Sequence, residues 1–143
     1  MLDEPVRRIM RSTTPVRARP GTLVARAAGL MAARNVGAIL VVEDDRLVGI
    51  LTERDIVFRV VAAGLDSRNT RIAEVMTRDP QAIDPARPFG YALALMHRGG
   101  FRHLPVVEDG KLLGIVSARS AMDPDLQEFS SEISRRKHFD SMR

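Results

Sequence analysis

Apolar residues recur along this chain with two different periods, and the pattern predicts alternating helices and strands. Two segments, each preceded by a short extended stretch, carry apolar residues at the spacing of one helix face. These residues are Leu23, Ala27, Leu30 and Met31 in the first segment and Phe89, Ala92, Leu93 and Met96 in the second. We therefore expect an amphipathic helix at each place.

Two short apolar runs separated by a polar turn follow each of these segments. The first copy reads AILVV, EDDR and LVGIL, and the second reads LPVV, EDGK and LLGIV. Because Asp and Gly suit the backbone of a tight turn, each copy predicts a β-hairpin. A second helix is expected after the first hairpin, with Gly64 at its end. Its apolar positions are Ile56, Val57, Val60 and Val61.

These similarities come from an internal repeat. A shift of 65 residues aligns residues 37–55 with residues 102–120 and places GILTERD on GIVSARS. Each copy predicts strand, helix, strand, strand, helix, an α+β fold with parallel pairing across the helix and antiparallel pairing in the hairpin. We expect two small mixed sheets packed about a pseudo-twofold axis. The chain divides into repeat 1 (1–66), repeat 2 (67–122) and a C-terminal amphipathic helix with a basic tail (123–143).

The composition is that of a folded, water-soluble chain. Of the 143 residues, 45% are hydrophobic and 28% are charged, which is too apolar for a disordered protein. No apolar stretch approaches the roughly 20 residues of a membrane helix, and the first residues lack the apolar centre of a secretory signal. We therefore expect a cytoplasmic protein without membrane contact. The absence of cysteine excludes disulfides, thiolate metal sites and cysteine nucleophiles.

The net charge of +4 lies at the two ends of the chain. Residues 1–20 hold five arginines against two acids, and residues 135–143 hold four basic residues against one acid, so the remainder has a net charge of −2. The body is therefore not a basic surface for nucleic acid. Near the C-terminus, Asp123 and Pro124 suit a helix start. Apolar residues then follow at helical spacing, at Leu126, Phe129 and Ile133.

Enzymatic signatures are missing from the sequence. There is no Walker A loop, no GxGxxG and no HExxH, and His97, His103 and His138 show no metal-binding spacing with carboxylates. Asp55 has the chemistry of a general base, but no partner acid or nucleophile recurs beside it. We predict no catalytic residue and no metal.

The stretch GILTERD carries the candidate chemistry. Thr52 ends a strand and begins a helix, where its hydroxyl and the free backbone N–H groups suit a phosphate. Asp55 suits the two hydroxyls of a ribose. Gly49 leaves room for a flat base, beside the apolar Ile50 and Leu51. The alternative is structural, because Thr-x-x-Asp at a helix start is typical of a capping box and the glycine of close packing.

The duplicated unit, with its glycine, two apolar residues, Thr or Ser, and Asp three residues later, resembles the cystathionine-beta-synthase (CBS) domain. Two copies resemble the tandem pair called a Bateman module, and the resemblance covers roughly residues 5–122. A pair of this length is similar to small standalone bacterial regulatory proteins. The resemblance implies a flat homodimer. It also implies binding of an adenosine compound (AMP, ADP, ATP, NAD or S-adenosylmethionine) between the repeats, as a regulatory ligand and not as a catalytic cofactor.

The resemblance implies a first cleft in which the Thr and Asp of repeat 1 act with the opening segment and hairpin of repeat 2. Within it, Arg102 and His103 are the candidates for binding phosphate, since arginine offers a planar fork and histidine a protonated ring. A solvated charge and a half-buried strand residue are the structural alternatives for these two. Besides Gly49, Ile50 and Leu51, the residues of this cleft are Thr52, Arg54, Asp55, Ile83, Phe89, Phe101, Arg102, His103 and Pro105.

A second cleft is expected to be weaker. It retains the hydroxyl of Ser117 but has Ser120 in place of the aspartate, and losing that acceptor weakens ribose binding about tenfold to somewhat over a hundredfold. Against this, Thr22 matches the family in the opening segment, whereas the opening segment of repeat 2 has Pro88 and no hydroxyl residue. The residues of this degraded site are Thr22, Val36, Gly37, Ala38, Leu40, Ser117, Arg119 and Ser120.

Two functions follow as hypotheses. The first is a regulatory module that binds an adenosine-containing nucleotide and signals to an unknown protein by changing conformation. The second is a ligand-independent module that binds proteins or nucleic acid through its dimer surface and basic termini. Nucleic acid is the less favoured partner, because the charge lies at the ends.

Overall fold

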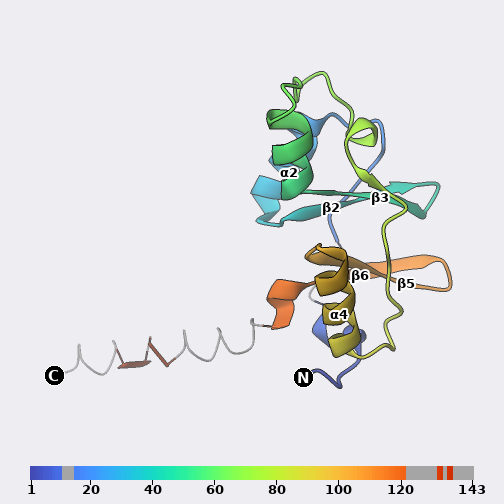
Figure 1. The fold of residues 1–143 in the computed structure, drawn as a ribbon, viewed down its shortest axis with the longest axis vertical. Helices are drawn as coiled ribbons and strands as arrows, with labels where there is room; N and C mark the ends of the chain where they lie inside the picture. The colour runs from blue at the N-terminus through green and yellow to red at the C-terminus, as the bar shows by residue number, and fades with distance from the viewer. Residues whose placement is uncertain (11–14, 122–131, 134, 137–143) are drawn as a thin grey trace.

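The computed structural model describes residues 1–10, 15–121, 132–133 and 135–136. Two halves lie one on the other, and each half contributes a β-hairpin to the plane where they meet (Figure 1). The mixed α+β fold and its sheets are as predicted. The elements are α1 (Val6–Ile9), β1 (Arg17–Ala18), α2 (Val24–Arg34), β2 (Ala38–Glu43), β3 (Arg46–Thr52), α3 (Glu53–Asp55), η1 (Ile56–Val61), η2 (Ile72–Glu74), β4 (Thr77–Arg78), α4 (Phe89–Gly99), β5 (His103–Glu108), β6 (Lys111–Ser117) and η3 (Ala118–Ala121).

Helices α2 and α4 confirm the helical periods, except that Leu23 precedes α2 and is 40% exposed. Their buried residues include Ala27 and Met31 in α2 and Ala92 and Met96 in α4. Each helix ends at a left-handed residue, Asn35 in one case and Gly100 in the other, which terminates the helical backbone. The duplication therefore extends to the way each helix ends.

Both hairpins form with two-residue turns. Asp44 and Asp45 in the first turn and Asp109 and Gly110 in the second all have positive φ, as the tightest hairpin turns require. Each hairpin also contains a bulge at the matching place, between Val41 and Val42 in one and between Val106 and Val107 in the other. Each sheet also gains a parallel contact, from β1 in the first half and from Ile83 in the second.

The helix after the first hairpin forms, but its winding was not foreseen. Only Glu53–Asp55 are α-helical, and Ile56–Val61 adopt a π-helix before Gly64 ends the run at a φ of 73°. Val60 is buried, whereas Val57 and Val61 are 53% and 69% exposed. The apolar stripe predicted for this helix therefore packs inward only in part.

The two hairpins pack face to face, and matching residues meet there. Leu112 contacts a buried group from the first hairpin, and equivalent positions of the two hairpins flank it, as a pseudo-twofold axis requires. This interface consists of Ala38, Leu40, Ile50 and Leu112, with Val42, Leu47, Val107 and Ile115 partly buried around them.

The first residues of the chain pack on the second half. Val6 of α1 is fully buried in the core that contains Phe89 and Leu104. The N–H groups of Phe89 and Gly90, at the start of α4, donate to the backbone carbonyls of Glu4 and Leu2. The N-terminus accordingly lies beside α4 (Figure 1).

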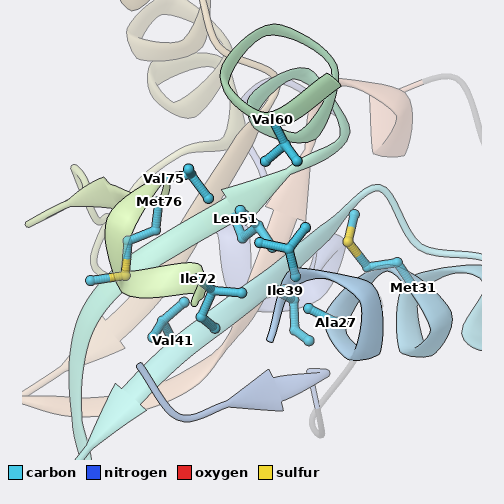
Figure 2. Packing of buried hydrophobic residues seen from close by; sticks show 10 residues of the cluster. Ala27, Met31, Ile39, Val41, Leu51, Val60, Ile72, Val75 and Met76 are labelled. Carbon is cyan, nitrogen blue, oxygen red and sulfur yellow. The ribbon is translucent and has the colours of Figure 1, made fainter. Parts of the chain in front are cut away.

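The first residues of repeat 2, which form the connection between the two halves of the structure, pack in the opposite sense, on the first half. Figure 2 shows Ile72, Val75 and Met76 in the same cluster as Ile39 and Leu51. The following strand β4 pairs with β3 and becomes the edge of the first sheet. The division at residues 66 and 67 stays a prediction about the repeats in the sequence, but core packing crosses it in both directions.

The C-terminal helix lies mostly outside the described residues. This holds for its predicted start at Asp123 and Pro124 and for Leu126 and Phe129. Ile133 is described and is 39% exposed. Within the described part of the chain, no helix has the length and apolar character needed to cross a membrane.

Candidate functional site at the junction of the repeats

The start of helix α3 is a closed capping box. The backbone N–H of Asp55 donates to the Thr52 hydroxyl oxygen at 3.2 Å. In return, the Thr52 N–H and hydroxyl donate to Asp55 Oδ2 at 3.0 and 3.1 Å. Asp55 is only 7% exposed. The structural alternative raised by the sequence is thereby confirmed, and the contacts of these two residues with ribose and phosphate stay predictions.

The second oxygen of Asp55 faces an arginine. Arg59 Nε lies 3.7 Å from Asp55 Oδ1, and the two residues are four positions apart on the helix. The Arg59 Nη1 atom also donates to the carbonyl oxygens of Val75 and Met76, both at 3.2 Å. The helix that begins at Thr52 is thus tied to the connection between the repeats.

Repeat 2 forms a weaker version of the same box. The Ser117 N–H donates to Ser120 Oγ at 3.4 Å, and the two serine hydroxyls lie 3.2 Å apart. Ser120 is 5% exposed, so it takes the structural place of Asp55 without its charge. The difference between Asp55 and Ser120 therefore weakens the capping of the helix start in repeat 2, in addition to its predicted effect on a ligand.

We expect Asp55→Ser to lower the free energy of unfolding by about 1–2 kcal/mol, since it replaces a charged acceptor at a helix start. Asp55→Asn keeps an acceptor for the Thr52 N–H and should lose less. Urea unfolding of the three proteins measures the difference. Equal stability of wild type and Asp55→Ser would show that the box does not stabilise the helix.

Residues of both repeats meet beside this helix start. A Cβ atom placed on Gly37 would lie 3.1 Å from Glu53 Oε1 and 3.2 Å from His103 Nε2, so the two side chains flank the same glycine. The Glu53 N–H donates to the Gly37 carbonyl at 3.0 Å. At the equivalent place in repeat 2, the Ala118 N–H donates to the Arg102 carbonyl at 3.0 Å. Gly37 was predicted in the second cleft, and its contact with a ligand stays a prediction. Glu53 was absent from the predicted site, since its side chain is brought to His103 only by the packing of the two halves.

Burial lowers the pKa of His103 below its ordinary value of 6.5. The Glu53 carboxylate acts in the opposite direction, and Arg102 adds to the lowering. Because desolvation is the largest of these causes, the imidazole at the junction is neutral at pH 7. A neutral ring can accept a hydrogen bond or donate one, but it offers no positive charge to a phosphate.

The lowered pKa of His103 predicts a loss of stability in acid. The unfolded chain protonates this histidine near pH 6.5 and the folded protein only at lower pH, so unfolding takes up a proton between the two values. The free energy of unfolding should fall as the pH drops through 6.5 and level off below the folded pKa. Urea unfolding at several pH values should show that His103→Gln removes this component. His97→Gln, at an exposed position, should not.

Several residues predicted to line the clefts are buried in this structure. Leu51 and Phe89 have no exposed surface and belong to the two main cores, and Leu40 is 1% exposed between the hairpins. A Cβ atom on Gly49 would be 3.0 Å from both Cγ and Cε of Met76, so close packing accounts for this glycine. Ligand contacts of these residues stay predictions. The other buried members are Ala38, Ile50, Asp55, Ile83, Pro105 and Ser120.

The remaining predicted residues are accessible. Arg54 is exposed, with its guanidinium 4.6 Å from the centre of the Phe58 ring on its own helix. Phe101 is partly buried against the core of the second half. Arg102 and Arg119 are exposed, and Thr22, Val36 and Ser117 are half-buried. Among the described residues, no three His, Cys, Asp or Glu side chains gather to hold a metal ion.

Comparison with known proteins identifies the repeats. The family model for the CBS domain matches residues 6–62 and 72–123. The chain is 36% identical over 152 aligned residues to the meiotically up-regulated gene 70 protein of Schizosaccharomyces pombe (strain 972 / ATCC 24843), covering 91% of this chain and 21% of that protein. The chain thus spans about a fifth of the length of the first curated relatives it matches.

Solved structures share most of this arrangement. A putative signal-transduction protein with CBS domains from Burkholderia ambifaria MC40-6 matches with a TM-score of 0.80 at 33% identity, covering 86% of this chain and 94% of that one. The CBS domain pair of protein MJ0100, in complex with 5′-methylthioadenosine and S-adenosyl-L-methionine, matches with a TM-score of 0.75 at 26% identity, covering 83% and 97%. This chain therefore belongs to the CBS domain family and carries two CBS domains in tandem.

Proposed function

We propose that this CBS pair is a regulatory module that binds an adenosine-containing ligand at the junction of its repeats. The ligand would act by favouring one arrangement of the two halves over another, and no chemical step is involved. The ligand class is AMP, ADP, ATP, NAD or S-adenosylmethionine. The related pair that holds 5′-methylthioadenosine and S-adenosyl-L-methionine supports an adenosine compound.

The observation that carries this proposal is the meeting of both repeats beside one helix start. Thr52 and Glu53 come from repeat 1 and His103 from repeat 2, and Gly37 lies between the last two. A ligand placed here would contact both halves at once. Binding energy of this kind depends on how the halves are arranged, which is what regulation by population shift requires.

The capping box changes the role proposed for Asp55. Its Oδ2 atom already accepts from the N–H and hydroxyl of Thr52, whereas Oδ1 lies 3.7 Å from Arg59 Nε. Because Oδ2 is already engaged and the Arg59 contact is longer than a hydrogen bond, Oδ1 is the atom that we assign to a ribose hydroxyl. The accessible Arg102 would hold the negatively charged part of a ligand.

Calorimetric titration of the purified protein with each of the five ligands tests the proposal. We expect saturable binding of at least one of them. Asp55→Asn and Arg102→Gln should each weaken binding about tenfold or more, because each removes a charge-assisted hydrogen bond. Arg46→Gln is the matched control, because Arg46 is exposed at the turn of the β2–β3 hairpin, and this variant should bind as wild type does. Absence of binding by every ligand would contradict the proposal.

We also propose that the module is a homodimer that uses the outer face of the helix after Thr52. Val57, Phe58 and Val61 are 53%, 60% and 69% exposed on this face, and Arg54 stacks on Phe58. Exposed aromatic and arginine side chains around an apolar centre are typical of protein interfaces. Light scattering should give twice the mass of the chain, and Val61→Asp should give a folded monomer. A monomeric wild type would refute the dimer.

A further inference from the structure

The side chain of Arg59 joins two parts of the molecule that are distant in sequence. On one side its Nε lies 3.7 Å from the buried Asp55 carboxylate. On the other, its Nη1 donates to the Val75 and Met76 carbonyl oxygens, both at 3.2 Å. One guanidinium group therefore contacts both the helix start and the segment that leads into the second half.

The segment that Arg59 holds is the connection between the two halves. Immediately after Met76, strand β4 pairs Thr77 with Ile50 and Arg78 with Gly49, and the Asp79 N–H then donates to the Val48 carbonyl at 3.2 Å. From there the chain passes to the second half (Figure 1). A change in the position of residues 75 and 76 would therefore be passed to β4 and to the orientation of repeat 2.

The helix that carries Arg59 has an unusual winding. Ile56–Val61 form a π-helix directly after Asp55. Such segments are rare and occur often at functional sites. They place side chains differently around the axis than an α-helix does, so Arg59 is positioned by a backbone that local sequence alone does not favour.

Repeat 2 has lost both members of this pair. At a shift of 65 residues, Asp55 corresponds to Ser120 and Arg59 to Pro124. Neither serine nor proline can form an ion pair, so the link exists in repeat 1 only.

We propose that Arg59 is a positioning residue that couples the Asp55 carboxylate to the connection between the repeats. The ligand part of this inference rests on the proposed function, because a ribose hydroxyl at Asp55 Oδ1 would compete with Arg59 for that oxygen. The Arg59 side chain would then move, its hydrogen bonds to the Val75 and Met76 carbonyls would change, and the pairing of β4 with β3 would change with them. The ligand-free part rests only on the contacts of the described residues.

Hydrogen exchange at the amides of Thr77–Asp79 tests the ligand-free part by a double-mutant cycle. Asp55→Asn, which retains the capping acceptor, should speed exchange at these amides about tenfold. Arg59→Gln should do the same, and the double variant should be no faster than either single one. Arg46→Gln is the control and should leave the rates unchanged. Additive effects of the two substitutions would overturn the coupling, and so would no effect of Asp55→Asn.

The ligand part is tested with the adenosine compound that binds wild type most tightly. Binding should change exchange at Thr77–Asp79 at least threefold in wild type and in Arg46→Gln. In Arg59→Gln the same compound should still bind, but the response of these amides should be lost, and Arg59→Lys should restore part of it. An unchanged response in Arg59→Gln would overturn the inference. Failure of all adenosine compounds to bind wild type would refute the proposed function and leave the double-mutant cycle to decide the coupling.

Discussion

Phe89→Ala should lower the free energy of unfolding by about 3–5 kcal/mol, the usual cost of removing a fully buried phenylalanine. Phe89 is the first residue of α4, has no exposed surface and belongs to the core that holds Val6 and Leu104. Because domains of this size have total stabilities of about 5–15 kcal/mol, the variant should be partly unfolded well below the wild-type transition. Urea unfolding followed by circular dichroism measures the effect.

Tyr91→Ala is the matched control for this experiment. Tyr91 lies on the same helix but is 46% exposed, with Arg87 5.0 Å from its ring centre. Its loss should cost no more than about 1 kcal/mol. If Phe89→Ala were as stable as Tyr91→Ala but bound adenosine ligands poorly, the ring would line a ligand site as the sequence suggested, and the core assignment would be wrong.

Ile72→Ala should lower the free energy of unfolding by about 2–5 kcal/mol, and the local loss of structure should lie in the first half. Ile72 is fully buried in the cluster of Figure 2, although in sequence it belongs to repeat 2. Its N–H donates to the Thr22 carbonyl at 2.8 Å, and the Val24 N–H donates to Thr70 at 2.8 Å. Loss of the side chain should therefore loosen the start of α2.

Urea unfolding gives the size of this effect and hydrogen exchange gives its location. Ile72→Val removes one methyl group and should cost about 0.5–1.5 kcal/mol. Faster exchange at the start of α2, with α4 unchanged, is the expected pattern. Faster exchange in α4 alone would mean that Ile72 supports the second half, and the crossed packing described for the connection would be incorrect.

Local features of this fold were accessible to sequence reasoning. The hairpins were predicted because apolar runs and turn residues are neighbours in the chain, and the positive φ of Asp44 and Asp45 is what an Asp-rich turn favours. The capping box at Thr52 was recognised as an alternative for the same reason, since its two members are three residues apart.

Features that depend on distant contacts were not accessible. The sequence placed Phe89 both on the apolar face of a helix and in a cleft, but it did not indicate that Val6, from the start of the chain, joins the same core. It also did not indicate that Glu53 lies beside His103, because only the face-to-face packing of the hairpins sets that approach. The π-helical winding after Asp55 has no simple sequence signal.

The crossed packing of Val6 on the second half and Ile72 on the first half has a consequence for how the chain folds. A protein cleaved at the exposed Gly64 would give one piece carrying Val6 and another carrying Ile72, and each of these side chains is fully buried in the half built mainly by the other piece. Neither piece alone completes its own interior. Each separated fragment should be unfolded in isolation, and the two should regain the native structure only when they are mixed, by fragment complementation.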